Sequence, residues 1–175
     1  RSRGLLLNQT EKTQTVKCAE RSGAPLEILT TPQWFIKSVE HKDELAKKST
    51  ELNWYPHSMK IKLDSWIKGV ALDWCISRQI WWGHRIPVYY KDGETLASIR
   101  PPEKFDGWEQ DPDTLDTWFS SALWSWSTLI DPELAKNYSL SLEDLLKRSP
   151  DFQKFHPTNI METGYDILFF WVARM

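Results

Sequence analysis

Cysteine is scarce in this sequence, and a long hydrophobic run is missing. The 175 residues include only two cysteines, Cys18 and Cys75, so they offer neither a disulfide framework nor the ligands of a closed zinc site. The longest apolar stretch, residues 167–173, is much shorter than the roughly 20 residues of a membrane-spanning helix. We therefore expect a soluble cytoplasmic protein, with no membrane partner and no bound zinc or other metal.

The chain also lacks an excess of charge of one sign. Its 22 Lys and Arg residues are balanced by 24 Asp and Glu residues, which gives a net charge of −2. A dedicated RNA-binding module would carry a basic footprint, so this balance argues against one. It does not exclude an enzyme that contacts RNA through other domains.

Tryptophan, by contrast, is abundant, with 11 residues of this type in the chain. Large aromatic side chains supply much of the energy that stabilises protein cores and binding pockets. The composition therefore predicts either a pocket that is lined by indole rings or indole rings that face a partner.

The local patterns predict helices that alternate with strands. Helices are expected at residues 38–50, 63–70, 119–129 and 165–175, and another is expected to begin after a serine N-cap at Ser141. Strands are expected around a turn within residues 15–29, at residues 159–163, and in a hairpin of residues 86–90 and 95–99. This alternation favours an α/β fold with a parallel sheet, and residues 103–113 are expected to form a polar loop.

The first segment with candidate chemistry is DWCISRQIWWGHRIP at residues 73–87. Trp81 and Trp82 precede Gly83, where the chain can turn tightly, so the indole rings can form a wall against a small apolar side chain. The alternative is that both are ordinary core residues. His84 lies in the same turn, either as a substrate contact or as a residue that only the backbone holds.

Two further segments are DTLDTWFSSALW at residues 113–124 and METGYDILFFWVARM at residues 161–175. Asp116, or Thr117, can cap the helix that follows it. Gly164 and Asp166 lie between an expected strand and an expected helix, where doubly wound folds bind nucleotides. An acid at this place can accept hydrogen bonds from both hydroxyls of a ribose. The alternative is an aspartate that the dipole of the helix favours.

In their order and residue identities, these segments resemble the sequence motifs of the valyl-tRNA synthetase family of class I aminoacyl-tRNA synthetases. The family pattern is similar to DWxISRQxWWGHxIP, DTWFSSALWP and ETGYDILFFWVARM, which this chain matches almost letter for letter. Residues 20–27 and 31–36 resemble the stretch where that family's editing domain returns to the catalytic core. The resemblance implies a Rossmann-like α/β catalytic domain at residues 37–175. It also implies that residues 1–36 are the β-rich end of the editing insertion.

The same resemblance implies the chemistry and the roles of several residues. It implies an ATP-dependent valine–tRNA ligase whose partners are valine, ATP and tRNA(Val), with Mg²⁺ accompanying the ATP. Trp82 and Trp118 would form walls of the valine pocket, and Asp116 would support Trp118. Gly164 and Asp166 would bind the adenosine, with Asp166 on the ribose hydroxyls. The full-length enzyme is expected to be a monomer.

The chain also departs from the family pattern. The HIGH and KMSKS signatures, which hold the ATP phosphates, are absent from the sequence. Ser22, Ser125 and Asn159 stand where some relatives have a zinc-binding cysteine, a proline and an aspartate. We therefore expect an internal fragment of the catalytic domain that is inactive alone. The alternative is a non-enzymatic tRNA-binding or assembly module; an open reading frame that continues past Met175 into KMSKS would favour the enzyme.

Overall fold

The computed structural model of the chain describes residues 4–5, 8–20, 22–102 and 107–175. The chain divides into two compact units, Arg1–Pro32 and Gln33–Met175. Part of the expected polar loop, residues 103–106, lies outside the described residues, as does Arg21 of the motif at residues 20–27.

The first unit contains a turn rather than the expected pair of strands. Gly23 has a φ of 69°, which suits a glycine, and one isolated antiparallel bridge joins Cys18 to Pro25. The backbone N–H of Leu26 donates to the carbonyl of Lys17 at 2.9 Å. Pro25 has no N–H to donate, so the ladder cannot extend through it in the regular way. The prediction of strands in residues 15–29 is therefore wrong beyond this single bridge.

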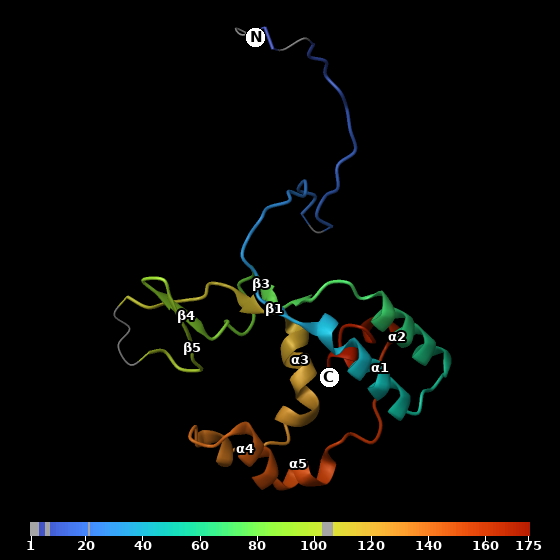
Figure 1. The fold of residues 1–175 in the computed structure, drawn as a ribbon, viewed down its shortest axis with the longest axis vertical. Helices are drawn as coiled ribbons and strands as arrows, with labels where there is room; N and C mark the ends of the chain where they lie inside the picture. Colours follow the sequence, from blue (N-terminus) through green and yellow to red (C-terminus); the bar gives the residue numbers. More distant parts are fainter. Residues whose placement is uncertain (1–3, 6–7, 21, 103–106) are drawn as a thin grey trace. The chain divides into compact units, whose positions relative to one another are not determined.

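The second unit begins with a pair of packed helices. The short 3-10 helix η1 (Ser38–His41) leads into α1 (Lys42–Glu51), and α2 (Ser58–Gly69) lies beside α1 (Figure 1). Ser49 of α1 donates to Asp64 of α2 at 2.6 Å. These bounds confirm the helices predicted at residues 38–50 and 63–70.

The hydrophobic core lies where this helix pair meets the end of the chain. Leu63 and Ile67 of α2 are buried together with Leu168 and Ala173. The spacing of Leu63 and Ile67 places both on one face of the helix, which is why the amphipathic pattern was visible in the sequence. The core therefore joins residues that are about 100 positions apart in the chain.

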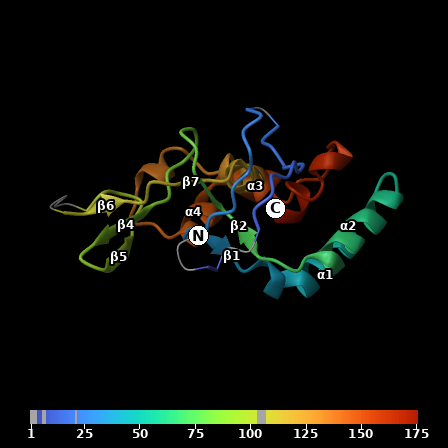
Figure 2. The same ribbon diagram turned by 90° about the horizontal axis from the view of Figure 1, so that it is seen from above.

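Every strand pair in the described part of the chain is antiparallel. The pairs are β1 (Phe35–Ile36) with β2 (Trp74–Cys75), β3 (Ser77–Arg78) with β7 (Thr114–Leu115), and β4 (Val88–Lys91) with both β5 (Glu94–Ala97) and β6 (Glu109–Gln110). Figure 2 shows β4, β5 and β6 together at one end of this unit. The expected parallel sheet is therefore wrong for these residues. Three helical elements, η1, α1 and α2, separate β1 from β2, in place of the single crossover helix that joins parallel strands.

The hairpin predicted at residues 86–90 and 95–99 is confirmed. Strands β4 and β5 pair in register from Val88 opposite Ala97 to Lys91 opposite Glu94. Asp92 and Gly93 have φ values of 49° and 83°, so both central residues of the turn are left-handed. This is the conformation that an Asp-Gly dipeptide favours in a two-residue hairpin loop.

The remaining elements are helical. They are α3 (Thr117–Ser127), η2 (Leu134–Lys136), α4 (Leu142–Arg148), α5 (Pro150–Phe155), η3 (Tyr165–Ile167) and η4 (Val172–Arg174). The Oγ of Ser141 accepts from the N–H of Asp144 at 3.1 Å, which confirms the predicted N-cap. In the described residues, no helix is long and apolar enough to span a bilayer.

The last segment differs from its prediction in two ways. Residues 159–163 form no strand, and the expected helix at residues 165–175 is two short 3-10 helices. Phe169 stacks on Trp66 with 5.5 Å between ring centroids, and Phe170 stacks on Trp118 with 5.8 Å. Adjacent aromatic residues thus pack against α2 and α3. Tertiary contacts of this kind can override the local preference for a regular helix.

Candidate functional site

Asp116 occupies the N-cap position of α3 and is only 6 % exposed. Its Oδ1 accepts a hydrogen bond from the backbone N–H of Trp118 at 3.4 Å. The N-cap alternative is therefore confirmed for Asp116, whereas Thr117 is the first residue of the helix. The same bond links Asp116 directly to the backbone of Trp118, the residue that it was expected to support.

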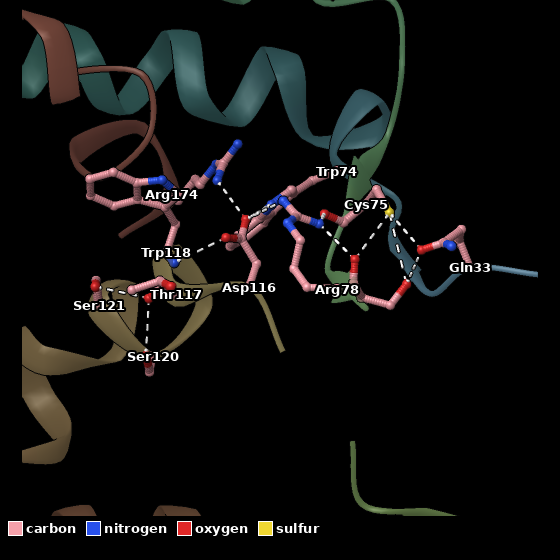
Figure 3. A network of polar contacts seen from close by, with 11 residues as sticks. Gln33, Trp74, Cys75, Arg78, Asp116, Thr117, Trp118, Ser120, Ser121 and Arg174 are labelled. Atoms are coloured by element: carbon pink, nitrogen blue, oxygen red, sulfur yellow. Dashed lines mark hydrogen bonds and ion pairs between the residues drawn. The ribbon is translucent and has the colours of Figure 1, made fainter. Parts of the chain in front are cut away.

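The other oxygen of Asp116 receives three side-chain donors (Figure 3). Trp74 Nε1 lies 2.9 Å from Oδ2, Arg78 Nη2 lies 2.8 Å from it, and Arg174 Nη1 lies 3.4 Å from it. We call Trp74, Arg78, Asp116 and Arg174 the Asp116 cluster. A buried carboxylate needs such donors, because burial without them would strongly disfavour its charge.

Two aromatic rings lie within cation–π distance of the Arg174 guanidinium in this cluster. Its Cζ lies 4.0 Å from the ring centroid of Trp74 and 5.6 Å from that of Phe170. Burial lowers the pKa of Arg174; the Asp116 carboxylate opposes this shift, and Arg78 adds to it. An arginine nevertheless remains charged at neutral pH, so the cluster holds two cations against one anion.

The loop that carries Trp81 and Trp82 is open to solvent. These side chains are 104 % and 88 % exposed, so the alternative in which they are core residues is wrong for this chain. Gly83 has a φ of 139°, and a Cβ there would lie 3.2 Å from the Cβ of Thr114. Glycine is therefore needed at the position after Trp82, both because the backbone has a positive φ and because β7 approaches closely.

His84 is held through its backbone, because its carbonyl accepts from the N–H of Leu115 at 2.7 Å. Its side chain is exposed. Both observations agree with a turn that the backbone stabilises. A contact between the His84 side chain and substrate stays a prediction.

Gly164 and Asp166 lie close together at the start of η3. Gly164 has an extended conformation, so it is not required by a positive φ. A Cβ on Gly164 would instead lie 2.5 Å from Oδ1 of Asp166. Asp166 is exposed, and the three-residue η3 has too few aligned peptide groups for a strong dipole. The glycine therefore leaves room for the carboxylate of Asp166 in its observed position.

A second buried carboxylate, that of Asp111, lies shortly before Asp116 in the sequence. Oδ2 of Asp111 accepts from Trp34 Nε1 at 2.8 Å and from the Tyr90 hydroxyl at 2.7 Å, and Oδ1 accepts from the Asp113 N–H at 2.9 Å. Burial alone would raise the pKa of Asp111, but these hydrogen bonds outweigh it and lower the pKa. Burial and the Asp111 carboxylate raise the pKa of Tyr90.

A polar network anchors the strand β3 that carries Arg78. The Ser77 hydroxyl donates to Gln33 Oε1 at 2.6 Å and accepts from the backbone N–H of Trp34 at 2.9 Å. Cys75 Sγ lies 3.5 Å from the same Gln33 oxygen (Figure 3). Because Ser77 is buried and its hydroxyl is satisfied, this network fixes the backbone from which Arg78 projects.

The structure thus joins some predicted site residues and adds others. Asp116 is bonded to Trp118, and Gly164 is adjacent to the Asp166 carboxylate, but a pocket shared by Trp82 and Trp118 stays a prediction. Sequence reasoning gave no role to Trp74, Arg78 or Arg174, which lie 42, 38 and 58 positions from Asp116. No periodicity links residues at such separations. Within the described ranges, no group of three or more His, Cys, Asp or Glu side chains is arranged to hold a metal ion.

Comparison with known proteins finds one family model and a set of similar sequences, all of them of tRNA synthetases. The family model for tRNA synthetases class I (I, L, M and V) matches residues 8–104 and 96–175. The valine–tRNA ligases of Bacillus licheniformis, Listeria monocytogenes and Bacillus subtilis are 42 %, 43 % and 41 % identical to the chain, over 98 % of its length. The chain spans 18 % of the length of each of these relatives.

Proposed function

Because the chain belongs to the class I tRNA synthetase family (I, L, M and V), we propose that it is an internal part of the catalytic domain of a valine–tRNA ligase. The observation that carries the proposal is the 41–43 % identity to valine–tRNA ligases over nearly the whole chain. The complete protein would activate valine with ATP and transfer it to tRNA(Val). We further propose that it acts in the cytoplasm as a monomer.

The proposed reaction has two steps. A carboxylate oxygen of valine attacks the α-phosphate of ATP, which forms valyl-adenylate and releases pyrophosphate. A hydroxyl of the terminal ribose of the tRNA then attacks the valyl carbonyl, and AMP leaves. Mg²⁺ would enter with ATP as part of the substrate. In such reactions the protein contributes mainly by positioning the reactants and by stabilising charge.

The proposed valine pocket has Trp82 and Trp118 as its walls. Valine offers only a branched apolar side chain, so its selection depends on shape. One methylene in an apolar pocket is worth only about 1–3 kcal/mol, which makes rigid walls important. The N–H of Trp118 is bonded to Asp116, and its ring stacks on Phe170, so this wall is fixed from two sides. Trp82 is exposed in this chain and is free of the core, which leaves its ring accessible to a ligand.

Asp166 and Gly164 form the proposed adenosine contact. The exposed carboxylate of Asp166 is able to accept hydrogen bonds from the two ribose hydroxyls. Gly164 has no side chain of its own, so an adenine ring can approach its backbone closely. We also propose that residues 37–175 belong to the Rossmann-like domain. Residues 1–36 would be the end of the editing insertion.

The direct test is valine-dependent exchange of pyrophosphate into ATP by the full-length protein that contains this chain. Valine should support the exchange better than isoleucine, leucine or methionine, and tRNA(Val) should then accept valine. If a different amino acid is preferred, the assignment to valine is wrong although the family is right. If no amino acid supports the exchange, the enzymatic proposal fails and an assembly or tRNA-binding module is favoured. Residues 1–175 alone should not catalyse the exchange, because they lack the HIGH and KMSKS signatures.

A further inference from the structure

The side chain of Arg174 connects the two halves of the proposed active site. It lies ten positions after Gly164, on the same segment as Asp166. Its guanidinium nevertheless contacts Asp116, which caps the helix of Trp118. One segment therefore carries the proposed adenosine contact near its start and a contact to the proposed valine pocket near its end.

Arg174 reaches Trp118 by two independent routes. The first is polar: Nη1 of Arg174 lies 3.4 Å from Oδ2 of Asp116, and Oδ1 of Asp116 accepts from the N–H of Trp118. The second is aromatic: Arg174 lies over the ring of Phe170, and Phe170 stacks on Trp118 at 5.8 Å and 21° between the ring planes. Both the backbone and the ring of Trp118 are thus held by partners of Arg174.

The environment of Arg174 makes this role depend on a guanidinium. Its side chain is only 16 % exposed, and its guanidinium lies over the ring of Trp74 and over the ring of Phe170. A planar guanidinium can stack on both rings while it donates in its own plane. A lysine ammonium keeps the charge but has no plane to stack, so it cannot satisfy both routes at once.

Arg78 holds Asp116 differently. Its Nη2 lies 2.8 Å from the same carboxylate oxygen, but its Nη1 donates to the carbonyls of Cys75 and Ser77 on its own segment. Arg78 therefore ties Asp116 to β2 and β3. Within the Asp116 cluster, Arg174 is the cation that brings the segment of Asp166 to this carboxylate.

We propose that Arg174 is a positioning residue for amino-acid selection, which orients the Trp118 wall through Asp116 and Phe170. The inference rests on the proposed function, because it assumes that Trp118 lines the valine pocket. It assigns Arg174 no contact with valine, ATP or tRNA. Loss of the guanidinium should displace the wall by a small distance, and misplacement of about 1 Å can reduce catalysis by about a hundredfold.

The test compares Arg174→Lys with Arg148→Lys in the full-length protein. Arg148 is an exposed residue at the end of α4, so the same substitution there is a matched control. In valine-dependent pyrophosphate exchange, Arg174→Lys should raise the KM for valine about tenfold or more and leave the KM for ATP within about twofold. Arg148→Lys should change neither constant.

Three results would overturn the positioning role. The first is a normal KM for valine with a lower melting temperature in Arg174→Lys, which would show that the arginine is merely structural. The second is a KM for ATP that rises as much as the KM for valine, which would place Arg174 with the nucleotide. The third is simple addition of the two effects on valine use in the Arg174→Lys, Trp118→Phe double variant, which would mean that the residues act independently.

The folding of the variant and the proposed function are checked separately. If Arg174→Lys does not fold, Arg174→Gln keeps a planar donor group without the charge and should show the same preferential effect on valine. If the wild-type protein shows no valine-dependent exchange, the proposed function has failed. If the wild type is active and both Arg174 variants keep a normal KM for valine, only the positioning role has failed.

Discussion

The indole of Trp34 donates a hydrogen bond to the carboxylate of Asp111, with 2.8 Å between Nε1 and Oδ2, across 77 positions of sequence. The Tyr90 hydroxyl donates to the same oxygen at 2.7 Å. The carboxylate thereby links the start of the second unit to the sheet of β4, β5 and β6. A buried anion with two side-chain donors is a strong candidate for control of stability by pH.

The first prediction concerns this pH dependence. The pKa of Asp111 is lowered in the folded protein, whereas an unfolded aspartate has a pKa of about 3.9. The stabilisation is therefore complete above a pH of about 4 and is lost as the pH falls through the lower folded pKa. Asp111→Asn should reduce the acid-induced loss in the free energy of unfolding, measured by urea titration at a series of pH values. Asp151→Asn, at an exposed position, should leave that loss unchanged.

The second prediction concerns Gly83, behind the exposed Trp82. An alanine there would combine a φ of 139° with a Cβ that lies 3.2 Å from the Cβ of Thr114. Gly83→Ala should lower the free energy of unfolding by about 1–3 kcal/mol. Gly69→Ala is the matched control, because a Cβ there meets no atom within 4 Å. It should be neutral or slightly stabilising in the same thermal melts; equal losses in the two variants would contradict the steric explanation.

The third prediction concerns Trp118 as a wall of the valine pocket. Trp118→Ala should reduce kcat/KM for valine at least about tenfold, with a much smaller effect on ATP use. Trp124 lies on the same helix and is 62 % exposed, so Trp124→Ala removes an equal side chain at a different place. Pyrophosphate exchange as a function of valine and of ATP measures both. A normal KM for valine in Trp118→Ala would show that the pocket is elsewhere.

The fourth prediction concerns Asp166 and its neighbour Gly164. Asp166→Ala should raise the KM for ATP or lower kcat and leave the melting temperature nearly unchanged, because Asp166 is exposed. Gly164→Ala should act in the same direction, since its Cβ would lie 2.5 Å from the observed position of Asp166 Oδ1 and would displace it. A large loss of thermal stability with normal kinetics would instead support a role for Asp166 in the fold.

The sequence was most informative where a few adjacent residues determine a structure. The turn at Asp92-Gly93, the N-cap at Ser141 and the amphipathic face of α2 depend on contacts within one helical turn or one tight loop. The helix predicted at residues 119–129 is found at Thr117–Ser127, because Asp116 caps it two residues earlier. Such local interactions can be predicted without knowledge of the rest of the chain.

The sequence was less informative where contacts between distant residues determine the structure. The antiparallel pairing of β1 with β2 joins residues that are far apart in the sequence, and the segment at residues 165–175 packs its aromatic rings on Trp66 and Trp118. The family motifs contain Arg78 and Arg174, yet their spacing does not show that both reach Asp116. Only the folded chain places two arginines and an indole on one oxygen atom.

That shared oxygen atom also limits how the site can be re-engineered. Its donors come from β2, β3 and η4, while the carboxylate itself belongs to the N-cap residue of α3. An exchange of the α3 segment with that of a relative of different amino-acid preference would leave two foreign arginines and a foreign indole around the transplanted aspartate. Substitutions in a network of this kind are not additive. Amino-acid preference should therefore transfer between relatives only when all four stretches are transplanted as one block.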